Sequence, residues 1–193
     1  MRPSIADPDR PCCEPDPRVL RARSGDDKAI HSLLVELIPR VRNLVRYLVR
    51  NDAETDDISQ DALIVVLRDL SAYRGEGTFN SWVDRVVARV TIRRLRSERS
   101  RTVVELRPIA PEVGTACSSE EFLLRRAVVR LLDRLPSEQR HALVLHHVLE
   151  MTVSEIAKEL DTSVETVRSR LRLAKSRLRE FGLAVDREDG MAE

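Results

Sequence analysis

The stretch TVSEIAKELDTSVETVRSRLRLAKSRLRE, residues 152–180, decides the fold of this chain. Thr152-x-x-Glu155 is a capping box that starts a short helix, and Asp161-Thr162-Ser163 then forms a turn. Apolar residues recur at helical spacing through a long second helix, predicted over 164–179, which Ser163 can cap. Two helices joined by such a tight turn predict a helix-turn-helix.

The second helix of this motif is basic on its outer face. Its six cations are Arg168, Arg170, Arg172, Lys175, Arg177 and Arg179. Over residues 164–180 the only acids are Glu165 and Glu180, so this segment has a net charge of +4. In a helix-turn-helix, early outward residues of the second helix lie near base edges and later cations face phosphates. The charge segregation therefore favours DNA binding over the alternative, a solvated helix in an ordinary bundle.

Two further helices precede the motif. Ser118-x-x-Glu121 is a capping box ahead of the first. Leu135-Pro136 ends that helix and starts the next, predicted from Ser137 to about Leu149. The second block therefore spans residues 119–181 and holds four helices.

The first block, residues 27–98, also follows a helical period. Its first helix has an apolar stripe from Ile30 to Leu48, with Pro39 inside it, so a kink or break is predicted near Ile38. A second helix is predicted from about 52–55. Gly75 and Gly77 break the chain before a third helix near Thr78.

No convincing strand alternation occurs in the sequence, so the predicted class is all-α: two small helical domains joined by a flexible linker, the second containing a helix-turn-helix. Residues 1–26 are rich in Pro, Asp and Arg and predict a disordered leader. Residues 99–118, with two prolines and a glycine, predict the linker, and residues 182–193 a polar tail.

Charge is separated in the first block as well. Residues 52–61 contain five acids and no base, whereas Asp84–Arg101 holds seven arginines against two acids. Tyr73, Phe79 and Trp82, half of the six aromatic residues, lie at the start of this basic helix. Aromatic rings beside arginines suit the unstacked bases of a single strand, and the alternative for Phe79 and Trp82 is core packing.

The composition of the chain excludes several classes of protein. The 193 residues include 33 Lys and Arg and 32 Asp and Glu, and the net charge of +1 is a cancellation between these segregated segments. No apolar run approaches the roughly 18 residues of a membrane span, and the N-terminus has no apolar signal region, so we expect a cytoplasmic protein. Three cysteines without a CxxC spacing do not predict a disulfide framework.

Catalytic patterns are lacking in the sequence. It has no Ser/His/Asp, Cys/His or Gly-rich phosphate-loop arrangement, so no catalytic residue and no cofactor is predicted. Asp56 and Asp57 would allow a metal-dependent hydrolase as an alternative function, but the sequence shows no second cluster of carboxylate or histidine ligands to complete a metal site. The histidines also lack the further ligands that a zinc site needs. We therefore expect no metal and no small-molecule substrate.

The two blocks, in this order, resemble a bacterial RNA polymerase sigma factor of the extracytoplasmic-function (group 4) type, over about 28–101 and 120–180. Three strings carry the resemblance: Asp56-Asp57-Ile58-Ser59-Gln60-Asp61-Ala62, Thr78-Phe79-Asn80-Ser81-Trp82, and Leu135-Pro136-Ser137-Glu138-Gln139-Arg140 followed by Thr166-Val167-Arg168-Ser169-Arg170. The resemblance implies binding to core RNA polymerase, through the β′ clamp and the β flap, and to promoter DNA. It also implies control by an anti-sigma factor.

The resemblance implies three sets of site residues. Core-polymerase binding is expected at Asp56, Asp57, Gln60 and Asp61. Minus-ten DNA binding is expected at Tyr73, Arg74, Phe79, Asn80, Trp82, Arg85, Arg89, Arg93 and Arg94. Minus-thirty-five DNA binding is expected at Ser163, Thr166, Arg168, Ser169, Arg170, Arg172 and Lys175.

The chain departs from the family at several of these positions. The family often has Asn where Arg89 stands, Asp where Arg93 stands, and a basic residue where Leu173 stands. It often has Gly where Asp161 makes the turn. The competing hypothesis is a stand-alone helix-turn-helix regulator whose first block is a sensor or dimer domain, and tight, salt-dependent duplex binding by the free protein would favour it.

Overall fold

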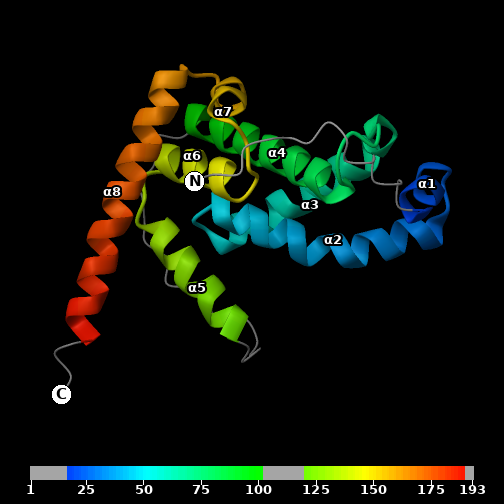
Figure 1. Cartoon of the computed structure of the whole chain (residues 1–193). Coiled ribbons are helices and arrows are strands. Elements are labelled where there is room, and N and C mark those ends of the chain that lie inside the picture. Colours follow the sequence, from blue (N-terminus) through cyan, green and yellow to red (C-terminus); the bar gives the residue numbers. More distant parts are fainter. Residues whose placement is uncertain (1–16, 102–119, 190–193) are drawn as a thin grey trace.

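The computed structural model describes residues 17–101 and 120–189, which are helical with no strand among them (Figure 1). The first block comprises α1 (Pro17–Arg23), α2 (Asp27–Leu48), α3 (Asp52–Arg68), a 3-10 turn (Leu70–Ala72) and α4 (Phe79–Arg101). The second comprises α5 (Glu120–Asp133), α6 (Ser137–His147), α7 (Val153–Glu159) and α8 (Val164–Asp189). The predicted all-α class and the helix-turn-helix are confirmed.

The leader prediction is wrong for residues 17–26. Helix α1 lies there, and it packs on α2 through Val19, which is fully buried, and Ala22. Gly25, at φ +86°, ends it in a left-handed turn whose hydrogen bonds run from Asp26 N to Arg21 O and from Gly25 N to Ala22 O. These two buried residues anchor the short helix. Two residues are too few to form a recognisable helical repeat in the sequence, so the helix was not predicted. Residues 1–16 lie outside the described part of the chain.

Of the kink or break predicted near Ile38, the break is wrong, because α2 continues through Pro39. A proline inside a helix loses one hydrogen bond and crowds the preceding turn. Pro39 lies on the exposed side of α2, however, while Leu37 and Val41 on either side are buried in the core. Burial of these neighbours holds the helix together across the proline.

The remaining boundaries of the first block follow their capping residues. The Asn51 side chain accepts a hydrogen bond from Ala53 N at the start of α3. Thr78 Oγ1 accepts one from Ser81 N at 3.2 Å, at the start of α4. Gly75 and Gly77 have φ of +81° and +91°, so the predicted break between the helices is confirmed.

The two blocks share one hydrophobic core. A single cluster of buried residues includes Leu48 and Val49 at the end of α2, Ile92 of α4, and Leu135 and Leu145 of the second block. Helix α2 contacts both α5 and α6, which lie against its C-terminal end in Figure 1. The predicted linker, 99–118, lies outside the described residues beyond Arg101, where α4 ends. The tail prediction is wrong up to residue 189, because α8 continues to there.

The helix-turn-helix forms as its capping residues predict. Thr152 and Glu155 make a reciprocal capping box, and Thr166 N donates to Ser163 Oγ at 3.1 Å. Between the helices, Asp161 has φ +49°, Thr162 N bonds to Ala157 O, and Asp161 N bonds to Lys158 O. This is a Schellman turn with aspartate in the position that favours glycine. The Ser118 capping box lies outside the described residues.

We predict that Thr152→Ala lowers the free energy of unfolding by about 1 kcal/mol, the usual contribution of an N-cap. Hydrogen bonds from the backbone and side chain of Thr152 lower the pKa of Glu155. A lowered carboxyl pKa stabilises the fold above the unfolded pKa, and that contribution is lost as pH falls through the folded value. Urea unfolding at neutral pH and near pH 3.5 should therefore show a larger penalty at neutral pH. Ser154→Ala, on the exposed first turn of the same helix, is the control and should change little.

Candidate nucleic-acid interface

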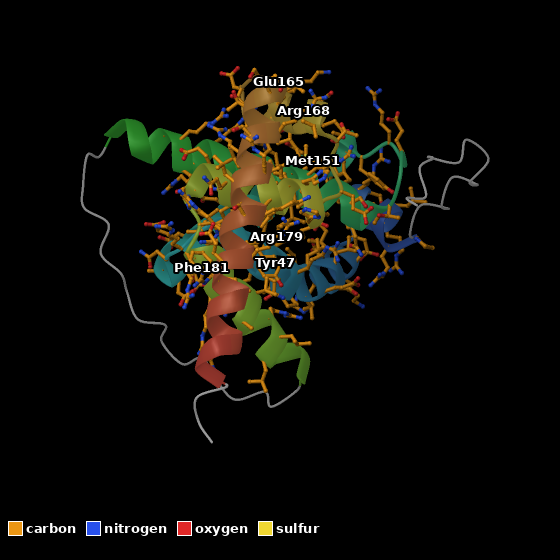
Figure 2. The ribbon with its side chains drawn as sticks, turned by 60° about the vertical axis from the view of Figure 1, so that its left-hand side comes forward. Tyr47, Met151, Glu165, Arg168, Arg179 and Phe181 are labelled. Atoms are coloured by element: carbon orange, nitrogen blue, oxygen red, sulfur yellow. The ribbon has the colours of Figure 1, made fainter. Side chains whose placement is uncertain are left out.

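The exposed side of α8 carries the cations predicted to bind the minus-thirty-five element. Arg168 and Arg172 are exposed, and Arg168 forms an ion pair with Glu165 one turn earlier. Figure 2 shows this pair near one end of α8, with Arg179 and Phe181 further along the helix. Ser163 and Thr166 cap the same end, their hydroxyl oxygens 2.8 Å apart. This end of α8 therefore presents cations and hydroxyl groups together, a suitable set for phosphates and base edges.

Arg170, Ser169 and Lys175 are less open to solvent. Arg170 lines a small pocket between the blocks, with Leu95 and Arg96 of α4 on its other side. Ser169 and Lys175 are half-buried. Burial lowers the pKa of His147, and the charges of His146 and Lys175 lower it further. The structure thus brings Arg168 and Arg172 to the exposed face of α8 and turns Arg170 toward the first block.

Helix α4 presents its predicted DNA-binding cations along one side. Arg85 lies 3.6 Å from a Glu155 oxygen, and Arg89 lies 3.5 Å from Glu159. Both acids belong to α7, so two ion pairs join the blocks here, although Arg85 and Arg89 remain 56% and 51% exposed. Arg93 is exposed on the same helix, whereas Arg94 pairs with Asp61 of α3 at 3.2 Å.

The aromatic residues form one cluster at the start of α4. The Tyr73, Phe79 and Trp82 ring centroids are 5.4–5.8 Å apart, and Phe79 stacks on Trp82. Tyr73 is only 4% exposed, and its hydroxyl donates to Gly77 O. Its ring is therefore closed to a base in this structure. Phe79, Trp82 and Asn80 are half-buried, and Arg74 is exposed beside them.

The acidic residues predicted to bind polymerase lie on α3. Asp56, Asp57 and Gln60 are exposed, and Asp61 is half-buried. Asp56 also pairs with Arg42 of α2 at 2.8 Å. Asp56 and Gln60 lie at the boundary with α2, whereas Asp61 pairs with Arg94 of α4.

An apolar groove between α2 and α3 was not predicted. It measures about 480 Å³ and borders Asp56 and Gln60. Its apolar lining is Leu34, Ile38, Leu63, Ile64 and Leu67. Ile38 and Ile64 are 49% and 56% exposed. Ile38 was counted in the predicted apolar stripe of the first helix, whereas Ile64 lies outside the predicted stripe of the second, so the only signal in the sequence was the extra width of these apolar faces.

A buried arginine lies between the blocks. Arg140 of α6 is fully buried, and its guanidinium donates to the carbonyl oxygens of Tyr47, Arg46 and Val49 at 2.6–2.8 Å. It also pairs with Asp133 of α5 at 2.7 Å. Burial lowers the Arg140 pKa to about 10, so the side chain stays charged at neutral pH.

Asp133 completes this arrangement, because it also accepts two hydrogen bonds from Arg46 of α2, at 2.9 and 3.1 Å. Arg140, Asp133 and Arg46 together are called the Arg140 cluster below. Nearby, the Arg50 side chain bonds to Leu135 O. The last turn of α2 leaves carbonyl oxygens without helical partners, and cations suit that helix end. Arg140 ends the string Leu135–Arg140 that resembles the sigma factor family, but the sequence does not indicate that its side chain is buried.

Histidine and acidic side chains are dispersed over the described part of the chain. No group of three or more His, Cys, Asp or Glu side chains lies close enough there to hold an ion. His146 Nδ1 lies 3.0 Å from Met151 O, a local contact at the end of α6. Among the described helices, none is long and apolar enough to span a bilayer.

The fold and these surfaces define an all-helical, DNA-binding transcription protein in which a helix-turn-helix is joined to a second helical block. Family models identify the blocks: residues 33–101 match sigma-70 region 2, and residues 125–178 match sigma-70 region 4. The chain belongs to the extracytoplasmic-function sigma factors of the sigma-70 family. The predicted resemblance is thereby confirmed.

Curated relatives agree with this assignment. The chain is 29% identical over 155 residues to the ECF RNA polymerase sigma factor SigM of Mycobacterium tuberculosis, covering 80% of this chain and 78% of that protein. It is 29% identical over 169 residues to the ECF RNA polymerase sigma-E factor of Escherichia coli K12, covering 79% and 86%.

Two solved structures share the fold. One is CnrH in complex with the cytosolic domain of CnrY, with a TM-score of 0.51, 21% identity, and coverage of 86% of this chain and 96% of that one. The other is the sigma factor RpoE in complex with the anti-sigma factor NepR from Bartonella quintana, with a TM-score of 0.52, 18% identity, and coverage of 79% and 96%. At these identities the likeness concerns the fold alone.

Proposed function

We propose that this protein binds core RNA polymerase and directs promoter-specific initiation, reading the minus-thirty-five element with α8 and reading and melting the minus-ten element with α4. The observation that carries the proposal is the presence of both sigma-70 regions, in order, in one chain. The protein acts as a binding factor, and the chemistry of RNA synthesis belongs to the polymerase.

The minus-thirty-five element is assigned to the exposed end of α8. Arg168 and Arg172 carry the charge, and Ser163 and Thr166 offer hydroxyl groups beside them. Ser169, Arg170 and Lys175 complete the predicted set. Such a face fits the major groove, where arginine can bind base edges with two hydrogen bonds.

The minus-ten element is assigned to α4 and the loop before it. Arg85, Arg89, Arg93 and Arg94 supply positive charge for the strand backbone. Phe79 and Trp82 supply partly exposed rings near Asn80 and Arg74 on which unstacked bases can lie. Tyr73 supports these rings from the interior.

Core polymerase is assigned to the groove between α2 and α3. Its apolar floor supplies area that excludes water, and Asp56 and Gln60 lie at its polar rim. Asp57 and Asp61 follow these residues on α3 and complete the predicted set. A central apolar patch with a charged rim is the usual composition of a specific protein interface. The β′ clamp is the expected partner here, and the β flap is the expected partner of the second block.

Control by an anti-sigma factor is part of the proposal. Among the solved structures, RpoE is complexed with the anti-sigma factor NepR, and CnrH with the cytosolic domain of CnrY. A protein that works with RNA polymerase and promoter DNA is placed in the cytoplasm.

Reconstitution with bacterial core polymerase tests the function. Holoenzyme containing the full chain should start RNA at a defined subset of genomic sites, identified by sequencing the RNA 5′ ends. Core polymerase alone is the control and should not select those sites. Initiation that does not depend on the chain would contradict the proposal. Tight promoter binding by the free chain, without polymerase, would instead favour the stand-alone regulator.

A further inference from the structure

We infer that Leu173 of α8 is a specificity-determining residue, which packs against the 5-methyl group of one thymine in the major groove of the minus-thirty-five element. The inference rests on the proposed function, because it concerns the α8 face assigned to that element. It adds a residue outside the predicted contact set and names the chemical group that this residue binds.

Leu173 is an apolar side chain outside the apolar stripe of its helix. Among the described side chains of α8, it is the one large apolar side chain that is exposed, at 44%. Val167, Leu171 and Ala174 form the buried stripe that holds α8 to the second block, and Leu173 is not part of that core cluster. Packing within the second block therefore does not account for a leucine at this position.

The direction of Leu173 follows from the helical repeat. Successive residues of an α-helix are turned by about 100°, so residues three or four positions apart lie on one line. Leu173 shares such a line with Ser169 and Ser176. Arg168 and Arg172 form the neighbouring line, and both are exposed. Leu173 therefore lies on the side of α8 that carries the arginines assigned to DNA.

Small neighbours leave the Leu173 side chain prominent on this side. Ser169 lies one turn before it and Ser176 one turn after it, and both side chains are shorter than leucine. The Ser176 hydroxyl also donates to Glu180 Oε1, at 3.4 Å, which directs it along the helix. A groove wide enough for α8 can therefore receive the leucine beside Arg172.

The charge around Leu173 identifies DNA as its partner. Residues 164–180 have a net charge of +4, and Arg172 and Ser176 beside the leucine are exposed and polar. The core of a protein interface is usually depleted of charge and broadly apolar. A single apolar side chain among cations and hydroxyl groups instead matches a helix that reads base edges.

Thymine is the base that fits this side chain. Its methyl group is the one apolar substituent that base edges present in the major groove. The other edges present hydrogen-bond donors and acceptors, which a leucine would cover without replacing their bonds to water. Leu173 therefore favours thymine by contact and disfavours the other bases by leaving polar groups unpaired.

Uracil substitution in the promoter tests the contact, because uracil lacks only the methyl group of thymine. Holoenzyme is assembled from core polymerase and the full chain, and its minus-thirty-five element is identified by sequencing RNA 5′ ends. Each thymine of that element is replaced in turn by deoxyuridine, and holoenzyme affinity for the promoter duplex is measured. Substitution of one thymine should weaken binding about fourfold, as expected for one methyl group withdrawn from contact.

Leu173→Ala provides the protein side of the same test. This variant should bind the thymine promoter about fourfold more weakly than wild type and should no longer distinguish thymine from uracil. Leu124→Ala truncates an exposed leucine of α5 in the same block. It is the matched control and should keep the fourfold sensitivity. The uracil comparison changes no protein atom, so a folding defect cannot produce its result.

Three results would overturn the inference. They are equal binding of wild-type holoenzyme to every uracil duplex and to the thymine duplex, wild-type uracil sensitivity in Leu173→Ala, and a minus-thirty-five element without thymine. All three leave the proposed function intact, because initiation by the same holoenzyme does not depend on them. Absence of chain-dependent initiation would instead contradict the proposed function. The uracil comparison is then made on duplexes that the free chain selects from a random library, with the same expected values.

Discussion

Reversing Arg168 and Arg172 to glutamate should lower promoter-dependent transcription by the reconstituted holoenzyme by about 100-fold. Each arginine is exposed on the α8 face assigned to the minus-thirty-five element, and a specific base contact is worth about 1–3 kcal/mol. Replacing arginine by glutamate removes the attraction between the guanidinium groups and the DNA phosphates and introduces carboxylates that repel those phosphates. The measurement is initiation rate on a promoter identified by RNA 5′-end sequencing, repeated over a range of salt concentrations.

The control for charge is Lys28→Glu with Arg68→Glu, two exposed cations of the first block that lie outside all the proposed contact residues. This variant should transcribe within about twofold of wild type, as expected for surface changes away from a binding site. The Arg168 and Arg172 variant should also show a shallower dependence on salt, since fewer phosphates are neutralised. Equal losses in the two variants would show that α8 has no special role.

Ile38→Asp combined with Ile64→Asp should weaken binding to core polymerase by about 100-fold. Both side chains lie in the groove between α2 and α3, and burying an unpaired carboxylate against a partner is costly. Loss of each interface anchor is expected to cost about 1.4 kcal/mol, which is about tenfold in affinity. Because both isoleucines are about half exposed in the free chain, helicity and thermal stability should change little. The measurement is an equilibrium titration of labelled chain with core polymerase.

Val35→Asp is the matched control for this prediction. Val35 is 59% exposed on the same helix as Ile38, but it does not line the groove. It should bind polymerase normally. Reversal of Asp57 and Asp61 to lysine should have a smaller effect, mostly on the rate of association, because these acids do not line the groove and charges outside an interface core act mainly on the encounter. Groove variants that bind within twofold of wild type would remove the groove from the proposed interface.

The helices were predictable because their caps and periods agree. Thr152 with Glu155, Ser163 and Gly75 each place a boundary by local chemistry that tertiary packing did not override. Local chemistry was less informative where tertiary packing determined whether a helix forms or continues. Pro39 was predicted to kink or break α2, yet burial of residues on the other side of the helix keeps it continuous. Helix α1 depends on two buried residues that no periodic pattern marks.

Parts of the candidate site were likewise predictable from the sequence, and parts were not. Charge segregation identified α4, α8 and the acidic side of α3, because charge is visible residue by residue. The groove between α2 and α3 was missed, since an exposed isoleucine in a sequence looks the same as a buried one. The Arg140 cluster was missed because its partners are mainly backbone carbonyl oxygens, 91–94 residues away, which leave no trace in side-chain patterns.

The ion pair between Asp61 and Arg94 joins two surfaces that were assigned to different partners. If polymerase engages Asp61, the arginine is released toward DNA, and DNA bound at Arg94 equally releases the acid for polymerase. Binding of the two macromolecules is then thermodynamically coupled, with the same factor in both directions. Because both side chains are about half exposed, an upper limit of about 1 kcal/mol, or roughly fivefold, applies to this cooperativity.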